Sequence, residues 1–233
     1  MSKILPNAPW RITKFNERAI HRQWWRRKID VKAPVVCENC NSGWMSRLEN
    51  EHAKPAMKDL ILNDNLAFLT SDRIKSITSF AFKSAVIADH MSVPTREPFF
   101  SVSARHAFAD SLQIPRGVRI WLAAFKEGGH GVFRAIYHPG PANAVRGFEL
   151  YVFTFGAGFL LFQVVASRWV GPEPSAAMTA TQGGVWNKFS IPIWPSSGDT
   201  VTWPAKKQLD LRWANEFAHR WKQVSVPGHW LNV

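Results

Sequence analysis

The chain has 233 residues, of which 46% are hydrophobic and 20% are charged. This length is enough to bury a core without disulfide bonds, which excludes the small scaffolds that depend on cross-links or a structural metal to fold. The net charge of +12 attracts phosphate at long range, so nucleic acid is the first class of partner that the composition favours.

The first 36 residues carry most of this electrostatic signal. They hold nine Lys and Arg residues against two acidic residues, Glu17 and Asp30. The opening MSKILPNAPWRITKF lacks the apolar stretch of about 7 to 15 residues that follows the charges of a secretory leader. We therefore expect a cytoplasmic protein whose N-terminal segment meets an anionic partner.

A basic helix is predicted after Asn16, a good N-cap, through ERAIHRQWWRRKI. Cations beside flat rings are typical of surfaces that neutralise phosphate and stack bases. In the alternative interpretation, Trp24 and Trp25 pack inward and the cations are only a solvated face over the core. The predicted nucleic-acid-binding residues are Arg18, Arg22, Trp25, Arg26, Arg27 and Lys28.

The segment around the two cysteines is predicted to be a strand followed by a helix. Val35 and Val36 read as a short strand, and NSGWMSRLENEHAK places Trp44 and Leu48 on one face of a helix that Pro55 interrupts. The cysteine pair then lies between the strand and the start of the helix.

Three interpretations of Cys37 and Cys40 remain open. Their spacing is typical of metal ligands or redox pairs rather than of structural cross-links. A zinc site needs two more ligands, for which His52 is the nearest candidate and His21 is another. A redox pair uses the thiols directly, and a metal-free remnant packs them as small apolar groups.

The phrase VVCENCNSGWMSRLENEHAKP resembles the closing half of the zinc module in a group of HNH-endonuclease-like bacterial proteins. In that family C-x-x-C-N-x-G-W-M-S-x-L-E follows an earlier C-x-x-C and a Glu-His pair. The resemblance implies a structural zinc held by four thiolates, and a His that activates water beside a divalent ion. Upstream of Cys37 there is no second cysteine pair and no Glu-His dipeptide. The resemblance therefore implies that the catalytic half is missing.

The middle of the chain is predicted to be helical. One helix begins at Thr70 or Ser71, either of which can accept hydrogen bonds from free backbone amides, and a short helix covers residues 103–112. The apolar residues of the first helix recur at helical spacing: Ile74, Ile77, Ala81 and Ala88.

From Gly117 onward the pattern becomes β-rich. The runs VRIWLAAF, GVFRAIY, GFELYVFTF and GFLLFQVVASRW predict an antiparallel meander, and FSIPIW adds a further strand. The apolar stretch 148–167 contains Glu149, Gln163 and a Gly-rich centre, which fits two buried strands better than a membrane span. KKQLDLRWANEFAHRWKQ predicts a closing amphipathic helix with apolar residues at every fourth position. They are Leu209, Trp213, Phe217 and Trp221.

These elements predict an α+β fold: N-terminal helices with a partial HNH-like zinc-ribbon remnant, an antiparallel β meander and a C-terminal amphipathic helix. We expect a basic helix and remnant at 1–62 and an α+β domain at 63–233. The leading hypothesis is a nucleic-acid-associated relative of HNH endonucleases that does not cut nucleic acid unaided, with zinc as its expected cofactor and no membrane partner. One alternative is a protein-binding inhibitor or defence component from the conflict between phages and bacteria, anti-CRISPR-like in blocking a nucleic-acid-processing complex. Another is a metal-dependent nuclease completed by a second subunit.

Overall fold

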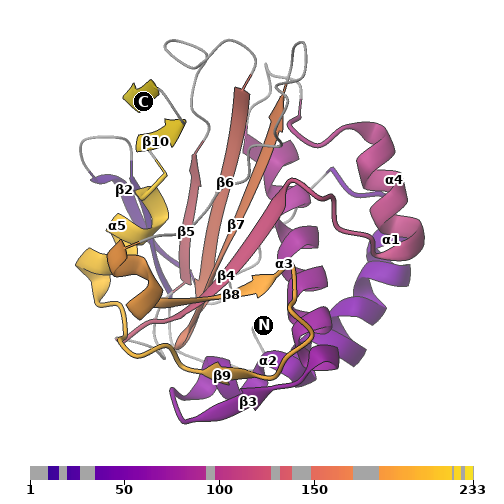
Figure 1. The fold of residues 1–233 in the computed structure, drawn as a ribbon. Helices are drawn as coiled ribbons and strands as arrows, with labels where there is room; N and C mark the ends of the chain where they lie inside the picture. Colours follow the sequence, from indigo (N-terminus) through magenta and orange to yellow (C-terminus); the bar gives the residue numbers. More distant parts are fainter. Residues whose placement is uncertain are drawn as a thin grey trace.

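The computed structural model confirms the α+β fold (Figure 1). The structure describes residues 10–15, 20–26, 35–92, 98–126, 132–137, 148–169, 184–221, 223–226 and 229–232. Among these residues, no helix combines the length and the apolar character needed to cross a membrane.

A five-stranded antiparallel sheet forms the centre of the fold. Its strands are β4 (Val118–Ala124), β5 (Val132–Tyr137), β6 (Phe148–Ala157), β7 (Leu160–Trp169) and β8 (Ser190–Trp194). They lie in the order β5-β6-β7-β4-β8. The predicted meander is therefore correct for β5, β6 and β7, whereas β4 pairs with β7 and β8 instead of its neighbour in sequence. This pairing places β4 in the interior of the sheet, where its almost fully apolar sequence is buried.

Helices cover both faces of this sheet. The helices α2 (Lys54–Leu62), α3 (Ser71–Ser92) and α4 (Val102–Ser111) share a large apolar core with one face. The other face packs against α5 (Leu211–His219) and the 3₁₀ turn η3 (Gly184–Lys188). Figure 1 shows α3 and α5 on opposite sides of the strands. Because both faces are buried, the sequences of β6 and β7 are almost continuously apolar, which explains why residues 148–167 approach the length of a membrane span.

The two predicted helices in the middle of the chain are confirmed. The hydroxyl oxygen of Thr70 accepts a hydrogen bond from the Arg73 N–H at 3.4 Å, next to the start of α3. The four residues predicted to share one face of this helix are all buried: Ile74, Ile77, Ala81 and Ala88. Ser101 caps α4 by accepting a hydrogen bond from the Ala104 N–H at 3.2 Å.

The segment after the cysteines is more continuous than predicted. Helical turns run through α1 (Glu38–Cys40), η1 (Asn41–Met45) and η2 (Leu48–Ala53) into α2, with a kink at Gly43. Pro55 does not end the helix. It directly follows η2, whose last turn is wide because the Lys54 N–H donates to the Glu49 carbonyl oxygen five residues back, and wide turns and kinks accommodate a proline inside a helix. Val35 and Val36 form a turn and a bend, so the strand predicted there is wrong.

The predicted basic helix is wrong for residues 20–26. This segment is β2 (Ile20–Arg26), which pairs antiparallel with β1 (Trp10–Phe15) in a separate two-stranded sheet. The physical reason is that the two strands are rich in Trp, Ile, Phe and Thr, which favour a pleated surface, and pairing with the preceding strand outweighs helical spacing.

Short strands also pair outside the five-stranded sheet. β3 (Ala67–Leu69) pairs with β9 (Val201–Trp203), and β10 (Gln223–Val226) pairs with β11 (His229–Asn232).

The C-terminal amphipathic helix is confirmed, but α5 begins only after Asp210, whose carboxylate accepts a hydrogen bond from the Trp213 N–H at 2.8 Å. Leu209 and Trp221 are buried beside this helix and not on it. The division of the chain at residue 62 stays a prediction, although α2 contributes to the same core as the sheet.

Candidate functional site

Cys37 and Cys40 form an exposed turn at the start of the helical segment. Cys37 is the N-cap residue of α1, and its Sγ accepts a hydrogen bond from the Cys40 N–H at 3.3 Å. The Asn41 N–H donates to the Cys37 carbonyl oxygen at 3.0 Å, so the two cysteines span one helical turn. Cys37 is exposed and Cys40 is partly buried, and neither is in a disulfide bond.

The two thiols differ in acidity. Hydrogen bonds from the side chain and the N–H of Cys40 lower the pKa of Cys37. The same side-chain interaction, with some burial, raises the pKa of Cys40. Cys37 is therefore the thiol that ionises first and the more nucleophilic position of the pair.

Trp44 fixes this turn to the body of the protein. Its ring meets Phe108 of α4 edge-on, with 5.8 Å between ring centroids. Its side chain also approaches Cys40 and lowers the pKa of that thiol, in opposition to the larger effect of Cys37. The kink at Gly43 separates the cysteine turn from η2, so Trp44 holds the turn in place where the helix axis breaks.

The described residues do not complete a zinc site around the cysteines. Among them, no three His, Cys, Asp or Glu side chains are gathered where they could hold a metal ion. The cysteine turn offers two thiolates for a tetrahedral site, but His52 is not gathered with it. Instead His52 lines a shallow open groove of about 710 Å³ beside Asp59, Asp72 and Arg73. Zinc binding stays a prediction.

A second candidate is a basic–aromatic cluster beside α5, which we call the α5 platform. Its rings are the exposed Trp213, the partly exposed Trp186 and the buried Phe189, and its cations are the exposed Lys188, Lys207 and Arg212. Trp213 stacks on Phe189 with 5.1 Å between centroids and meets Trp186 edge-on at 5.8 Å. It remains 38% exposed.

The cations of the α5 platform come from segments that the fold brings together. The Lys207 N–H donates to the Lys188 carbonyl oxygen at 2.8 Å, and the Lys207 Nζ lies 5.9 Å from the Phe189 ring centroid. Arg212 is exposed next to Trp213 on α5. Lys207 thus lies beside Phe189, on which Trp213 stacks, and Lys188 and Arg212 are exposed cations on the adjoining backbone. Cations near a partly exposed ring are typical of surfaces that attract phosphate and stack bases.

A buried polar centre supports the platform from below. The Arg220 guanidinium lies 4.2 Å from the Phe217 ring centroid and 5.6 Å from that of Trp186. Its Nε donates to the Oε1 of the fully buried Gln163 at 2.7 Å. Burial lowers the pKa of Arg220 well below its usual value. This side chain therefore packs among the aromatic rings and holds their positions.

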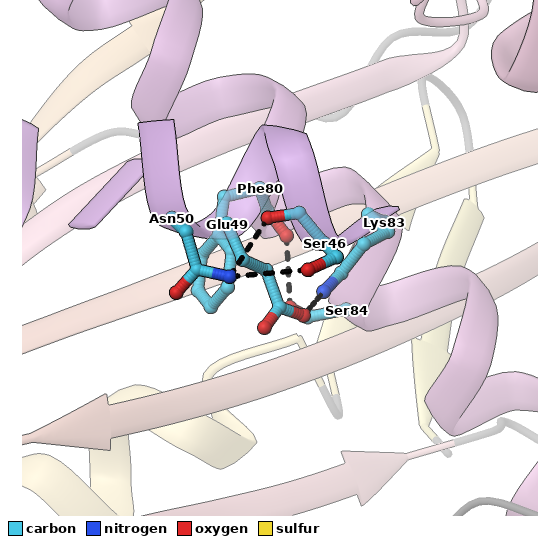
Figure 2. Close-up of polar contacts among 6 residues, drawn as sticks. All are labelled: Ser46, Glu49, Asn50, Phe80, Lys83 and Ser84. Atoms are coloured by element: carbon cyan, nitrogen blue, oxygen red, sulfur yellow. Dashed lines mark hydrogen bonds and ion pairs between the residues drawn. The ribbon is translucent and has the colours of Figure 1, made fainter. Parts of the chain in front are cut away.

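A buried lysine joins η2 to α3 (Figure 2). Lys83 is 4% exposed and forms an ion pair with Glu49, while its Nζ lies 4.9 Å from the Phe80 ring centroid. Figure 2 also shows Asn50, whose amide donates to the carbonyl oxygen and the hydroxyl of Ser46 at 3.0 and 3.2 Å. A buried lysine is a catalytic candidate in general, but here it faces a carboxylate of its own chain and holds two helices together.

Lys83 predicts a pH dependence of stability. Burial lowers its pKa in the folded protein, and the Glu49 carboxylate opposes that effect only in part. Between the folded and unfolded pKa values the unfolded chain binds more protons, so stability rises with pH across this window. We expect the unfolding free energy of the wild type, minus that of Lys83→Met, to increase from neutral to alkaline pH in denaturant titrations. Lys75→Met, an exposed position on the same helix, is the matched control. A difference that is flat or falls with pH contradicts the assignment.

The predicted nucleic-acid-binding residues are brought together only in part. Arg22, Trp25 and Arg26 lie on β2, and their register partners on β1 are Lys14, Arg11 and Trp10, respectively. The other three predicted residues, Arg18, Arg27 and Lys28, lie outside the described residues.

Sequence reasoning missed the α5 platform. The repeating apolar pattern places Trp213 on the buried face of the C-terminal helix, and Lys188 and Lys207 are far from it in sequence. The local signal that could have found the platform is the LRW sequence at residues 211–213, in which a cation adjoins an aromatic ring.

Comparisons of the chain with protein families, with curated proteins and with solved structures gave no match. The HNH-like resemblance therefore stays a prediction from the motif.

Proposed function

We propose that the protein binds nucleic acid without hydrolysing it unaided. The α5 platform carries this proposal, because it combines a partly exposed tryptophan, Trp213, with three exposed cations on the adjoining backbone, one of which lies beside the ring under Trp213. Rings of this kind stack bases of any identity, and cations beside them track the phosphate backbone, so single strands are the favoured ligand. The net charge of +12 supports the same class of partner.

The β1–β2 ribbon supports the proposal independently. Its register places Lys14 opposite Arg22, so two cationic residues share one position of the ladder. A two-stranded ribbon is also one of the elements that fit the major groove of a duplex. We therefore keep nucleic-acid binding as the hypothesis for these residues, with contact made from a two-stranded ribbon and not from a helix.

The test is binding of a short labelled single-stranded oligonucleotide, followed by fluorescence anisotropy at several salt concentrations. We expect Trp213→Ala to weaken binding by about 1 to 3 kcal/mol, roughly 5- to 150-fold in Kd. Replacing Lys188, Lys207 and Arg212 with Ala should reduce the salt slope by about 0.7 for each phosphate that is no longer neutralised. Arg22→Ala and Arg26→Ala test the ribbon in the same way.

Two matched controls separate stacking and local charge from general effects. Trp213→Phe keeps an aromatic face and should retain most of the affinity, whereas Trp213→Leu should not. Lys75→Ala removes an exposed cation from α3, on the other side of the sheet, and should change the Kd little. Binding that is insensitive to salt and to all platform substitutions refutes the proposal. Cleavage of the oligonucleotide with Mg²⁺ or Mn²⁺, lost on chelation, would instead favour the nuclease alternative.

A protein partner is the second candidate function. Three large apolar side chains are exposed within seven residues of chain: Leu62, Leu66 and Phe68 at 43%, 68% and 63%. Exposed apolar residues mark protein-binding surfaces where they form a contiguous patch, and these three lie close together in the chain. A pull-down from nuclease-treated lysate that recovers one stoichiometric partner, lost on Phe68→Ser, supports this candidate. A protein that is recovered from untreated lysate but not from nuclease-treated lysate is held through nucleic acid, and this result supports nucleic-acid binding instead.

A further inference from the structure

We infer that Cys37 and Cys40 form a dithiol that exchanges reversibly with disulfides, with Cys37 as the attacking thiol and Cys40 as the resolving thiol. The inference is independent of nucleic-acid binding. It begins from the misfit with zinc, because the described residues bring no third ligand to the pair. The same two sulfurs meet the requirements of a redox pair in two respects: spacing and exposure.

The spacing of the two cysteines is compatible with a disulfide bond between them. The hydrogen bond from the Asn41 N–H to the Cys37 carbonyl oxygen defines one helical turn across the pair. Residues three apart in a helix have Cα atoms about 5 Å apart. Disulfides join Cα atoms that are about 4.4 to 6.8 Å apart, so Cys37 and Cys40 lie within the permitted range.

The exposure of the two sulfurs is unequal, and this assigns their roles. Cys37 is exposed, and its Sγ accepts the Cys40 N–H, which stabilises negative charge on that sulfur. Cys40 is partly buried against Trp44. An external disulfide therefore reaches Cys37 first, and Cys40 lies one turn away, where it can attack the mixed disulfide.

The exchange consists of two balanced steps with a small-molecule disulfide, R–S–S–R, as the oxidant. The Cys37 thiolate attacks one sulfur, the S–S bond breaks, and R–S⁻ leaves and takes a proton from water. Cys40 then gives up its proton to solvent and attacks the Cys37 sulfur, which forms the Cys37–Cys40 bond and expels the second R–S⁻. Two thiols of the protein are oxidised by two electrons, and one disulfide is reduced to two thiols.

To test the inference, the purified full chain is equilibrated with mixtures of reduced and oxidised glutathione. The fractions of thiol, mixed disulfide and intramolecular disulfide are then measured by acid quenching, alkylation and mass spectrometry. We expect an intramolecular disulfide whose fraction follows the glutathione ratio in both directions. Cys40→Ser should trap glutathione on Cys37, and Cys37→Ser should react roughly tenfold or more slowly. Ser42→Ala, an exposed neighbour in the same turn, should behave like the wild type. Neither cysteine belongs to the core, so far-UV circular dichroism should be unchanged in all variants.

Three outcomes overturn the inference: Cys40 reacting as fast as Cys37, mixed disulfides that accumulate in the wild type without closing, and one bound zinc per chain that protects both thiols until a chelator is added. Oligonucleotide binding measured on the reduced and oxidised forms keeps the two proposals apart. A Cys37–Cys40 disulfide that forms and opens reversibly in a protein that does not bind the oligonucleotide supports this inference alone. Oligonucleotide binding without reversible disulfide formation supports only the proposed function.

Discussion

Replacing Gln163 with Leu is expected to lower the free energy of unfolding by about 3 to 5 kcal/mol. Gln163 is fully buried on β7. Its Oε1 accepts hydrogen bonds from Arg220 Nε and Trp221 Nε1, both at 2.7 Å. Its amide donates to Thr154 Oγ1 and to the Phe217 carbonyl oxygen, both at 2.8 Å. Leu removes all four hydrogen bonds at once, including one to a buried guanidinium, and buried polar groups that lose their partners carry the full cost of desolvation.

Urea or guanidinium titrations measure this loss, and Thr154→Val is the matched control. It removes only one of the four hydrogen bonds and should cost about 1 kcal/mol. A loss below about 1 kcal/mol for Gln163→Leu would mean that the surrounding groups find other partners, contrary to the network described. Because Arg220 lies against the rings beneath Trp213, the same variant should also weaken oligonucleotide binding.

The parts of the fold that could be predicted from the sequence are those with a strong local period. The spacing of Ile74 and Ile77 predicted α3, and both residues are buried in it. The Gly-rich centre of residues 148–167 predicted the turn between β6 and β7, where Gly158 has a positive φ of 59°. In each case the determining interaction lies within a few residues of chain, so a local pattern is sufficient.

The elements that were wrong depend on strand pairing or on helix geometry. Ile20 and Trp24 have helical spacing, but β2 forms because it pairs with β1. Likewise β4 leaves the meander because its best partner is β7, about 40 residues later. A proline breaks a helix in most positions, but Pro55 directly follows the wide turn of η2, where the Lys54 N–H donates to the Glu49 carbonyl oxygen. Periodicity alone carries none of this information.

The same distinction holds for the candidate sites. The sequence identified Cys37 and Cys40 from spacing alone, whereas their unequal exposure and the hydrogen bond to Cys37 Sγ needed the folded turn. The α5 platform could not be predicted, because a backbone hydrogen bond between Lys207 and Lys188 brings its cations together across 19 residues. The exposure of Trp213 follows from the start of α5 after Asp210, later than the repeating apolar pattern indicated.

Gly158→Ala is the other substitution expected to have a large effect, at roughly 3 kcal/mol or more of unfolding free energy. A Cβ at this position would lie 1.9 Å from the Ile61 carbonyl oxygen, which is backbone of α2 and cannot rotate away. Moving the turn would also break the hydrogen bond from the Phe159 N–H to the same oxygen, which is 3.0 Å long. A left-handed conformation alone costs a non-glycine residue about 1 to 2 kcal/mol.

Gly184→Ala separates these contributions, because Gly184 has a similar φ of 63° and no atom within 4 Å of the position that a methyl group would occupy. It should cost only the conformational part, about 1 to 2 kcal/mol. Equal losses of unfolding free energy for the two variants in denaturant titrations would show that the β6–β7 turn moves away from Ile61 with no further loss of stability. In that case α2 does not depend on the contact. A much larger loss for Gly158→Ala means that the β6–β7 turn fastens α2 to the sheet. The helical segment that carries the cysteine turn would then be stabilised by the same close backbone contact.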